Sequence, residues 1–379
     1  MRKTATLTRA IQRSRKKEHL FPKMPNTFEE MSVPEHLTQT VSGERFLLYE
    51  GPTSEESLDK MIIFSSREQL DVMSGAEYWI ADGTFDIVNQ TLFYQLFVVT
   101  AVTSTGITIP CLFSLLPNKS TNTYQKVFEE IKEKGVLPPK GSFKTDFEQG
   151  IIKGFENAYP GVAVRCCDTH WKRAIRRKIV QDYGLGSLYN SNAAFQTLVR
   201  YLWGLSLVPV EDVVSVWENF IGTEFESMQA SFAEEDQASI EAFLGYFERT
   251  WVGNLNQRTW IRRAPLFKHD YWNKYSSVLE EDILTSNAAE GFNNALSSSV
   301  PRNASVWTLI QQLRTEESLC IKKIRDAALG PQNIQSIAPN TSRNKRKSQR
   351  AEDLKSLVSN YRSLPIKLYL SSLVDFYND

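Results

Sequence analysis

The feature that most constrains this chain is the stretch from Ile87 to Asn118, which contains no charged residue. Its length invites comparison with a membrane-spanning helix, which needs about 20 apolar residues. Polar residues interrupt it, however, and its apolar blocks at 92–102 and 107–116 are rich in β-branched and aromatic side chains. Such blocks, separated by a Ser-Thr-Gly turn, predict two buried neighbouring strands rather than a membrane span.

Weaker patterns on either side extend this strand pair into an alternating series of strands and helices. Strands are expected at 45–50, 61–65, 78–85, 142–146 and 162–167, and helices at 121–135, 147–159 and 170–184. Taken by itself, this order predicts a mixed α/β fold. Three leading strands followed by strand–helix units is also the order of a ribonuclease-H-like core.

The rest of the chain differs in composition, and this difference defines the expected domains. Five of the eight tryptophans and a helical periodicity fall within 185–285, which predicts an all-α insertion. The expected segments are 1–74, a basic arm with a short α/β extension; 75–184, the first part of the core; 185–285, the insertion; 286–329, a helix that breaks near Pro301; 330–350, a basic flexible linker; and 351–379, a helical tail.

The net charge alone argues against a uniformly basic nucleic-acid-binding protein, because 44 Lys and Arg balance 44 Asp and Glu. The charges are nevertheless segregated. Residues 1–23, 165–178 and 343–350 are strongly basic, whereas 201–248 contains ten acidic residues and no Lys or Arg. Contacts with phosphate groups are therefore expected to be local and sensitive to salt. With only four cysteines in the chain, a reducing compartment is the simplest expectation.

Three carboxylates stand where a strand ends or a helix begins, which makes each a candidate metal ligand. Asp82 lies near the end of an expected strand, although Asp-Gly is also a common hairpin turn. Asp146 ends another strand, where an aspartate can equally well cap the next helix. Glu290 follows Asn287 by three residues, which is the spacing of a capping box. Taken singly, each carboxylate has an ordinary structural explanation.

A cysteine and a histidine, Cys167 and His170, occur at a strand-to-helix junction with a spacing that lets both bind one zinc ion. The alternative is a buried cysteine followed by a histidine at a helix start. The other two ligands of a closed zinc site would come from Cys111, Cys166, Cys320 or His269.

The helix that follows carries five cations within seven residues, namely Lys172, Arg173, Arg176, Arg177 and Lys178. They form either a solvated face or a surface that contacts phosphate groups, and their closeness to the candidate carboxylates favours the second interpretation. The tryptophans between 203 and 272 are likewise either core residues or, in part, platforms on which an unpaired base stacks.

Several short motifs occur in an order that resembles one protein family. They are A-D-G-T-F at 81–85, L-L-P-N-K at 115–119 with Tyr124, T-D-F-E at 145–148, C-D-T-H-W at 167–171 and S-N-A-A-E at 286–290. Over about residues 60–300, the ordered set resembles the transposase domain of Mutator-like elements, the MULE family.

This resemblance implies a ribonuclease-H-like fold with a D-D-E metal triad and an all-α insertion before the glutamate. By motif, Asp82, Asp146 and Glu290 match the triad and would bind Mg²⁺ or Mn²⁺. Cys167 and His170 match a C-x-x-H element that supports the site, with Zn²⁺ as a further expected ligand. The implied partners are DNA, as transposon ends and target, and a second copy of the chain. A nuclear location and no membrane association are implied as well.

The resemblance has one departure. Such transposases usually carry an N-terminal zinc-binding module for DNA recognition, but residues 1–75 contain no cysteine and only His19 and His36. The sequence therefore leaves several interpretations open. The chain is a fragment, a transposase that depends on a separate DNA-recognition protein, or a domesticated derivative that binds DNA without catalysis. A ribonuclease-H-like nuclease of host origin is a weaker alternative.

Overall fold

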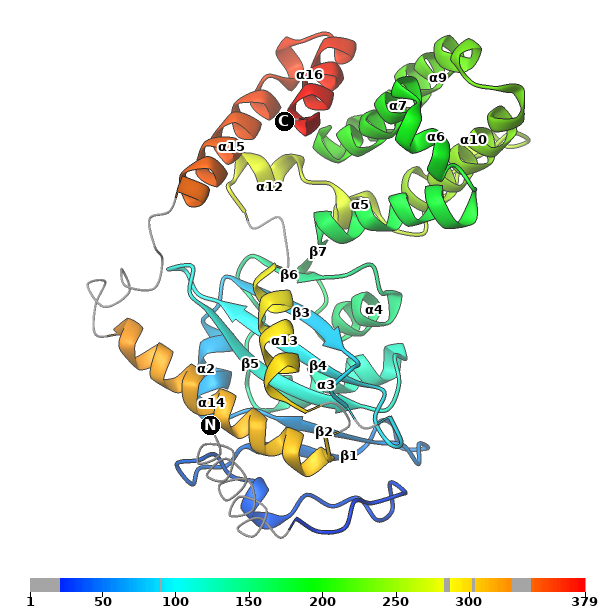
Figure 1. The fold of residues 1–379 in the computed structure, drawn as a ribbon. Helices are drawn as coiled ribbons and strands as arrows, with labels where there is room; N and C mark the ends of the chain where they lie inside the picture. The colour runs from blue at the N-terminus through cyan, green and yellow to red at the C-terminus, as the bar shows by residue number, and fades with distance from the viewer. Residues whose placement is uncertain (1–20, 89, 283–286, 302–303, 329–341, 379) are drawn as a thin grey trace, which may run out of the picture.

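The computed structural model describes residues 21–88, 90–282, 287–301, 304–328 and 342–378. Within these ranges the chain forms a lobe built on a β-sheet and a second lobe made mostly of helices (Figure 1). Most of the basic N-terminal arm and the first part of the expected linker lie outside the described residues.

The first lobe is built on a seven-stranded sheet with the strand order β1-β2-β5-β4-β3-β6-β7. The strands are β1 (Leu47–Pro52), β2 (Lys60–Phe64), β3 (Tyr78–Thr84), β4 (Gln95–Val102), β5 (Thr108–Leu116), β6 (Ser142–Thr145) and β7 (Ala163–Cys166). Neighbours from β1 to β3 run antiparallel, whereas β6 is parallel to both β3 and β7. The mixed α/β class expected from the sequence is confirmed.

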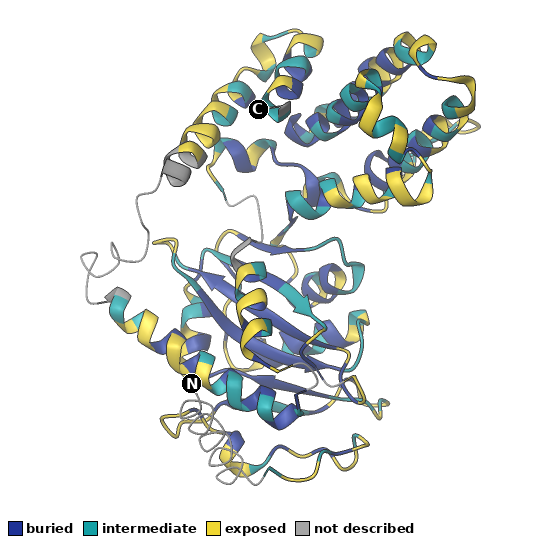
Figure 2. Cartoon of the chain, viewed as in Figure 1, coloured by how far each residue is buried: buried dark blue, intermediate teal, exposed yellow. Residues whose placement is uncertain are grey.

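The uncharged stretch forms β4 and β5, as expected, and every residue of β4 is buried. Phe97 and Val99 of β4 belong to the hydrophobic cluster on one face of the sheet, and Leu96 and Val98 to the cluster on the other. Figure 2 shows the resulting buried sheet. In the described part of the chain, no helix combines the length and the apolar character that crossing a bilayer requires.

Helices cover both faces of this sheet. The first face packs against α2 (Arg67–Ser74), α3 (Thr121–Glu133) and α4 (Gln149–Ala158). The second packs against α13 (Asn287–Ser299) and α14 (Val306–Ala328), which lie on either side of Pro301. Helix α2 was not expected from the sequence, because its eight residues are too few to show a clear helical periodicity.

The second lobe begins with α5 (Asp168–Arg177), which continues into the π-helical turn η2 (Lys178–Asp182). Its further elements include α6 (Gly186–Ser191), α7 (Ala193–Gly204), η3 (Leu205–Leu207), α8 (Val213–Val216), η5 (Trp217–Ile221), α9 (Gly222–Met228), α10 (Glu234–Phe247), η7 (Glu248–Val252), α11 (His269–Trp272) and α12 (Tyr275–Leu279). The C-terminal helices α15 (Ser342–Ser359) and α16 (Ile366–Asn378) belong to the same lobe, where the Tyr369 hydroxyl donates to the Leu207 carbonyl.

Two details differ from the sequence-based expectation. The region 185–285 is not entirely helical, because β8 (Leu255–Asn256) and β9 (Ile261–Arg262) form an antiparallel hairpin. Strands of two residues are too short to produce a recognisable alternation. Helix α15 begins at Ser342, inside the stretch expected to be a flexible linker. Its Lys, Arg and Gln residues are polar, but they are also good helix formers. Their polarity alone therefore did not distinguish a helix from a flexible linker.

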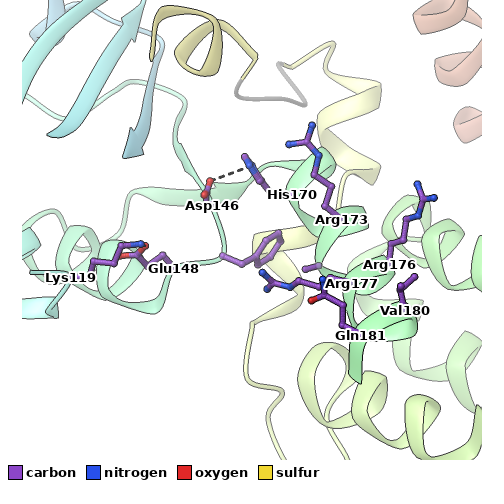
Figure 3. Close-up of a pocket in the computed structure, with 11 residues that line it drawn as sticks. Lys119, Asp146, Glu148, His170, Arg173, Arg176, Arg177, Val180 and Gln181 are labelled. Atoms are coloured by element: carbon purple, nitrogen blue, oxygen red, sulfur yellow. Dashed lines mark hydrogen bonds and ion pairs between the residues drawn. The ribbon is translucent and has the colours of Figure 1, made fainter. Parts of the chain in front are cut away.

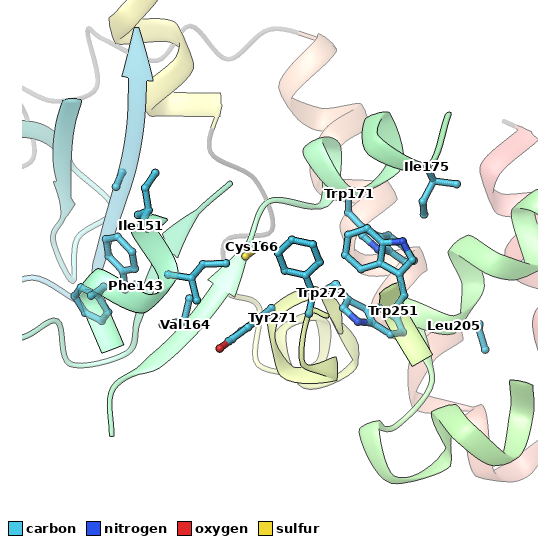
Figure 4. Close-up of a cluster of buried hydrophobic side chains, with 14 of the residues drawn as sticks. Phe143, Ile151, Val164, Cys166, Trp171, Ile175, Leu205, Trp251, Tyr271 and Trp272 are labelled. Carbon is cyan, nitrogen blue, oxygen red and sulfur yellow. The ribbon is translucent and has the colours of Figure 1, made fainter. Parts of the chain in front are cut away.

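One hydrophobic cluster runs through both lobes. It extends from Phe143 and Val164 in the sheet to Trp171, Trp251 and Trp272 in the helical lobe (Figure 4). The Trp171 and Trp272 rings stack with centroids 5.0 Å apart. Buried aromatic contacts of this kind hold α5 in a fixed place between the lobes.

Candidate active site

Asp82 lies within β3, opposite Val98 of β4, and the strand continues to Thr84. The alternative of an Asp-Gly hairpin turn at this point is therefore wrong. Its carboxylate is half-buried, and it accepts hydrogen bonds from the Gly83 amide (2.9 Å) and from Asn293 Nδ2 (2.8 Å). Asp82 is thus held on a rigid central strand by contacts from both sides.

Asp146 directly follows β6, the parallel neighbour of β3. Ile80 is paired with Lys144, so Asp82 and Asp146 lie two residues further along adjacent strands. Because side chains alternate between the faces of a sheet, both carboxylates reach the same face. Helix α4 begins only at Gln149 and has Glu148 at its N-cap, so Asp146 does not cap it.

His170 lies between two of the candidate carboxylates. It comes from the first turn of α5, and its Nδ1 is 3.3 Å from Asp146 Oδ1 while its Nε2 is 3.7 Å from Glu290 Oε1. Glu290 is carried by α13, which packs on β3 through Ala289. Asp146 and Glu290, far apart in sequence, therefore meet at one imidazole ring, and Asp82 on the neighbouring strand interacts with both carboxylates and the ring electrostatically.

The electrostatics of this cluster are unbalanced. Burial raises the pKa of Asp82 and raises that of Asp146 to about 6, and repulsion between the carboxylates acts in the same direction. A hydrogen bond with Cys167 and the nearby carboxylates raise the pKa of His170 to about 9. At neutral pH a single imidazolium thus faces three acids, and the site favours an additional positive charge.

The donor set is suited to a hard divalent cation. Carboxylate oxygens are the preferred protein ligands of Mg²⁺, and Asp146 Oδ1 is buried with His170 Nδ1, 3.3 Å away, as its charged neighbour. A second set competes with it, because potential ligand atoms of Cys167, His170 and Glu290 lie within 4.8 Å of one another. Cysteine and histidine favour Zn²⁺. The two sets share Glu290.

The other cysteines and histidine considered for a zinc site are engaged elsewhere. Cys166 points its Sγ at the Asp146 carbonyl, and His269 Nε2 lies 3.0 Å from the Val252 carbonyl. Cys111 is buried in β5 and Cys320 in α14. None of the four belongs to the set around Cys167 and His170 in the described residues.

Beside Asp146 and His170 lies a cavity of about 700 Å³ (Figure 3). Arg173, Arg176 and Arg177 line it from α5, a spacing that puts them on one face of the helix. The other two cations of the predicted basic helix lie apart from this cavity. Lys172 pairs with Asp168 at 2.8 Å, and Lys178 pairs with Asp182.

Sequence reasoning assigned no role to a chain of hydrogen bonds at the edge of this cavity. Gln95 donates to the Tyr124 hydroxyl at 2.6 Å, and Tyr124 donates to Glu148 at 2.6 Å. Lys119 binds the other oxygen of Glu148 at 2.7 Å.

The sequence analysis also assigned no role to Asn293, whose side chain donates to Asp82. Its position three residues after Glu290, on the same helix face, is the signal that points to it.

Residues 78–173 match the family model described as the MULE transposase domain. The matched segment contains Asp82, Asp146, Cys167 and His170, and it ends within α5, before the rest of the helical lobe and Glu290. No curated protein matches the chain at a significant level.

Proposed function

We propose that this chain, whose residues 78–173 belong to the MULE transposase domain family, is a divalent-metal-dependent DDE transposase that cleaves and transfers DNA strands. The observation that carries the proposal is that Asp146 and Glu290 both contact the His170 ring, while Asp82 lies on the strand next to Asp146 and interacts electrostatically with these residues. The match of residues 78–173 to the MULE transposase domain model supports a transposase-related function and an interaction with DNA. Catalysis, the metal and the residue roles belong to the proposal.

The arrangement of the sheet supports a ribonuclease-H-like core. Strands β5, β4 and β3 are antiparallel neighbours, and β6 and β7 continue the sheet in parallel beyond β3. In this proposal the helical lobe is the insertion that separates the second carboxylate from the third. In open sheets of this kind, functional side chains gather at the carboxyl ends of parallel strands, where Asp146 lies.

Asp82, Asp146 and Glu290 would hold Mg²⁺ or Mn²⁺ in the active protein. When bound, two such ions neutralise charge at the attacking and leaving oxygens of a phosphodiester. The chain itself orients the ligands, because Asn293 fixes Asp82 and His170 contacts the other two carboxylates. Water is the nucleophile in the first step, and the 3′-hydroxyl of the transposon end is the nucleophile in strand transfer.

Arg173, Arg176 and Arg177 are the residues we assign to contacts with the DNA backbone. Each phosphate they neutralise releases counterions, so binding weakens as salt increases. Trp260 is the residue best placed to stack on an unpaired base, because it is 77% exposed at the β8–β9 hairpin. We place the protein in the nucleus, as a homo-oligomer in its active form and with a separate DNA-recognition module.

One observation favours a second candidate function, a DNA-binding derivative without catalysis. His170 stands between Asp146 and Glu290, and the tightest potential metal set is Cys167, His170 and Glu290 rather than the three carboxylates. A Zn²⁺ ion bound there would engage Glu290 and leave the triad incomplete. Terbium luminescence separates the functions, since a catalytic site binds the lanthanide in competition with Mg²⁺.

The decisive experiment measures nicking and strand transfer on DNA that carries transposon ends, with Mg²⁺ or Mn²⁺. We expect Asp82→Asn, Asp146→Asn and Glu290→Gln each to lower the cleavage rate by at least about 1,000-fold, or roughly 4 kcal/mol. Asp71→Asn, at an exposed position on α2, is the matched control and should retain the full rate. Cleavage that survives the first two substitutions would contradict the triad.

A further inference from the structure

A second cavity lies on another side of α5, away from the three arginines. Its volume is about 330 Å³, and it is enclosed by α5, η3, the start of α12 and the C-terminal helices α15 and α16. The candidate active site does not use it. Two of its walls come from the C-terminal tail, so it exists only while that tail is docked on the helical lobe.

Positive charge dominates this cavity. Among the described residues, Lys172, Lys274 and Arg350 line it together with one carboxylate, Asp168. Lys172 Nζ lies 2.8 Å from Asp168 Oδ2, so this pair is neutral overall. Within the described lining, Lys274 and Arg350 therefore leave an excess of two positive charges.

Most of the free-energy cost of this excess positive charge falls on Lys274, because its ammonium group is buried. It is only 3% exposed, and its ammonium group donates to the backbone carbonyl of Cys166. A carbonyl satisfies one of three donors and supplies no negative charge. Burial lowers the pKa of Lys274, as expected for a cation removed from water. An anion in the cavity would relieve this cost directly.

The rest of the lining is apolar and aromatic. The Tyr377 ring lies 4.3 Å from Lys172 Nζ, and the Phe376 ring lies 4.4 Å from the Arg350 guanidinium. Leu207 and Leu354 complete this wall. A few fixed charges on an apolar surface are typical of pockets for small ligands, which have volumes from about 300 Å³ upwards.

We propose that this cavity binds a small ligand of the mononucleotide class. Its phosphate would lie between Lys274 and Arg350, and its flat apolar part would pack against Phe376 and Tyr377. Lysine and arginine are the usual phosphate-binding side chains, and the aromatic wall favours a phosphate attached to a ring system over a free phosphate ion. Because Arg350 and Tyr377 belong to the tail, the bound ligand would also fasten the tail to α5.

Isothermal titration calorimetry on the full chain tests this proposal with AMP, adenosine and inorganic phosphate. We expect AMP to bind most tightly, phosphate more weakly and adenosine not at all. Arg350→Gln removes the charge from an exposed side chain but leaves a donor for the Phe376 carbonyl, so it should weaken AMP binding about tenfold at a small folding cost. Lys274→Met should abolish binding, and Lys322→Gln, exposed on α14, is the matched control.

Three outcomes would overturn the proposal. They are no binding of AMP at millimolar concentration, equal affinity of the wild-type protein and Arg350→Gln, and displacement of AMP by a short single-stranded DNA without a terminal phosphate. The last result would assign the cavity to the DNA backbone. None of these measurements depends on strand cleavage, so they are independent of the transposase proposal.

Discussion

Two buried charge clusters share strand β6 and differ in how their charges are compensated. Lys144 and Asp282 form a 2.7 Å ion pair in which the side chains are 6% and 11% exposed. Two residues further along, Asp146 meets other carboxylates with His170 as the nearby cation. The first cluster is electrically neutral, whereas the second carries excess negative charge.

The difference separates charges that are balanced within the fold from charges that are not. The Lys144–Asp282 pair ties β6 to the end of the segment that follows α12. The carboxylate cluster gives the fold no such benefit, since burial and repulsion both oppose its ionisation. Unfavourable features such as buried like charges tend to occur at functional sites, where a bound ligand can compensate their charge.

The largest expected effect comes from breaking the balanced pair. Asp282→Ala leaves the Lys144 ammonium buried without its partner and should lower the free energy of unfolding by about 3–5 kcal/mol. Urea denaturation measures this loss. The double variant Lys144→Met/Asp282→Leu removes both charges and should regain most of it. A loss below about 1 kcal/mol in the single variant would show that the pair is not structural.

A divalent cation should restore the balance of the second cluster. At a Mg²⁺ concentration ten times the dissociation constant, ligand linkage raises the free energy of unfolding by about 1.4 kcal/mol. Thermal or urea unfolding with and without EDTA measures this gain. Asp146→Asn should lose the gain while Asp71→Asn keeps it. Equal stabilisation of all three proteins would mean that the cation binds elsewhere.

Without metal, removing one carboxylate should stabilise the protein. Burial raises the pKa of Asp146 from its ordinary value of 3.8 to about 6. The folded state thus holds this proton more tightly, and wild-type stability falls as pH rises from about 4 to about 6. The shift corresponds to about 3 kcal/mol, but the side chain is 38% exposed, so solvent screening leaves about 1 kcal/mol.

The measurement for this effect is urea unfolding in EDTA at pH 7 and at pH 4. Asp146→Asn should exceed the wild-type free energy of unfolding at pH 7 and match it at pH 4, where the native carboxyl is protonated in the folded state. A variant that is less stable than wild type at pH 7 would refute an electrostatic cost at this position.

The smallest expected effect concerns backbone strain rather than charge, at Trp260. Trp260 has a positive φ of 55°, which is unfavourable for a bulky residue, and its ring is largely exposed. Trp260→Gly should relieve this strain and stabilise the fold by about 0.5 kcal/mol after the entropy of glycine is subtracted. It should also weaken binding to DNA with an unpaired base by about tenfold, whereas Trp260→Phe retains stacking.

Fluorescence of 2-aminopurine at the unpaired position reports this stacking directly. Trp272→Phe, a buried tryptophan in the core, is the control for a general loss of structure. If Trp260→Gly binds such DNA as tightly as wild type, the exposed ring has no stacking role.

The central sheet was largely predictable, because the strands β4 and β5 are buried on both faces and therefore form continuous apolar runs. The proximity of Asp82 and Asp146 also follows from local patterns once their strands are neighbours. The contacts made by Lys144 with Asp282 and by Asp82 with Asn293 could not be predicted in this way. They join residues more than 130 positions apart, and no periodicity carries that information.

The position of α13 also sets the order in which the protein is assembled. Glu290 is made more than 200 residues after Asp82, which at about 5–20 residues per second is a delay of roughly 10–40 s. During that time the strands of the sheet are already available for pairing, but the third carboxylate does not yet exist. If the proposed triad is catalytic, a growing chain lacks one of its three ligands until α13 has been made, and a product truncated before α13 should not cleave DNA.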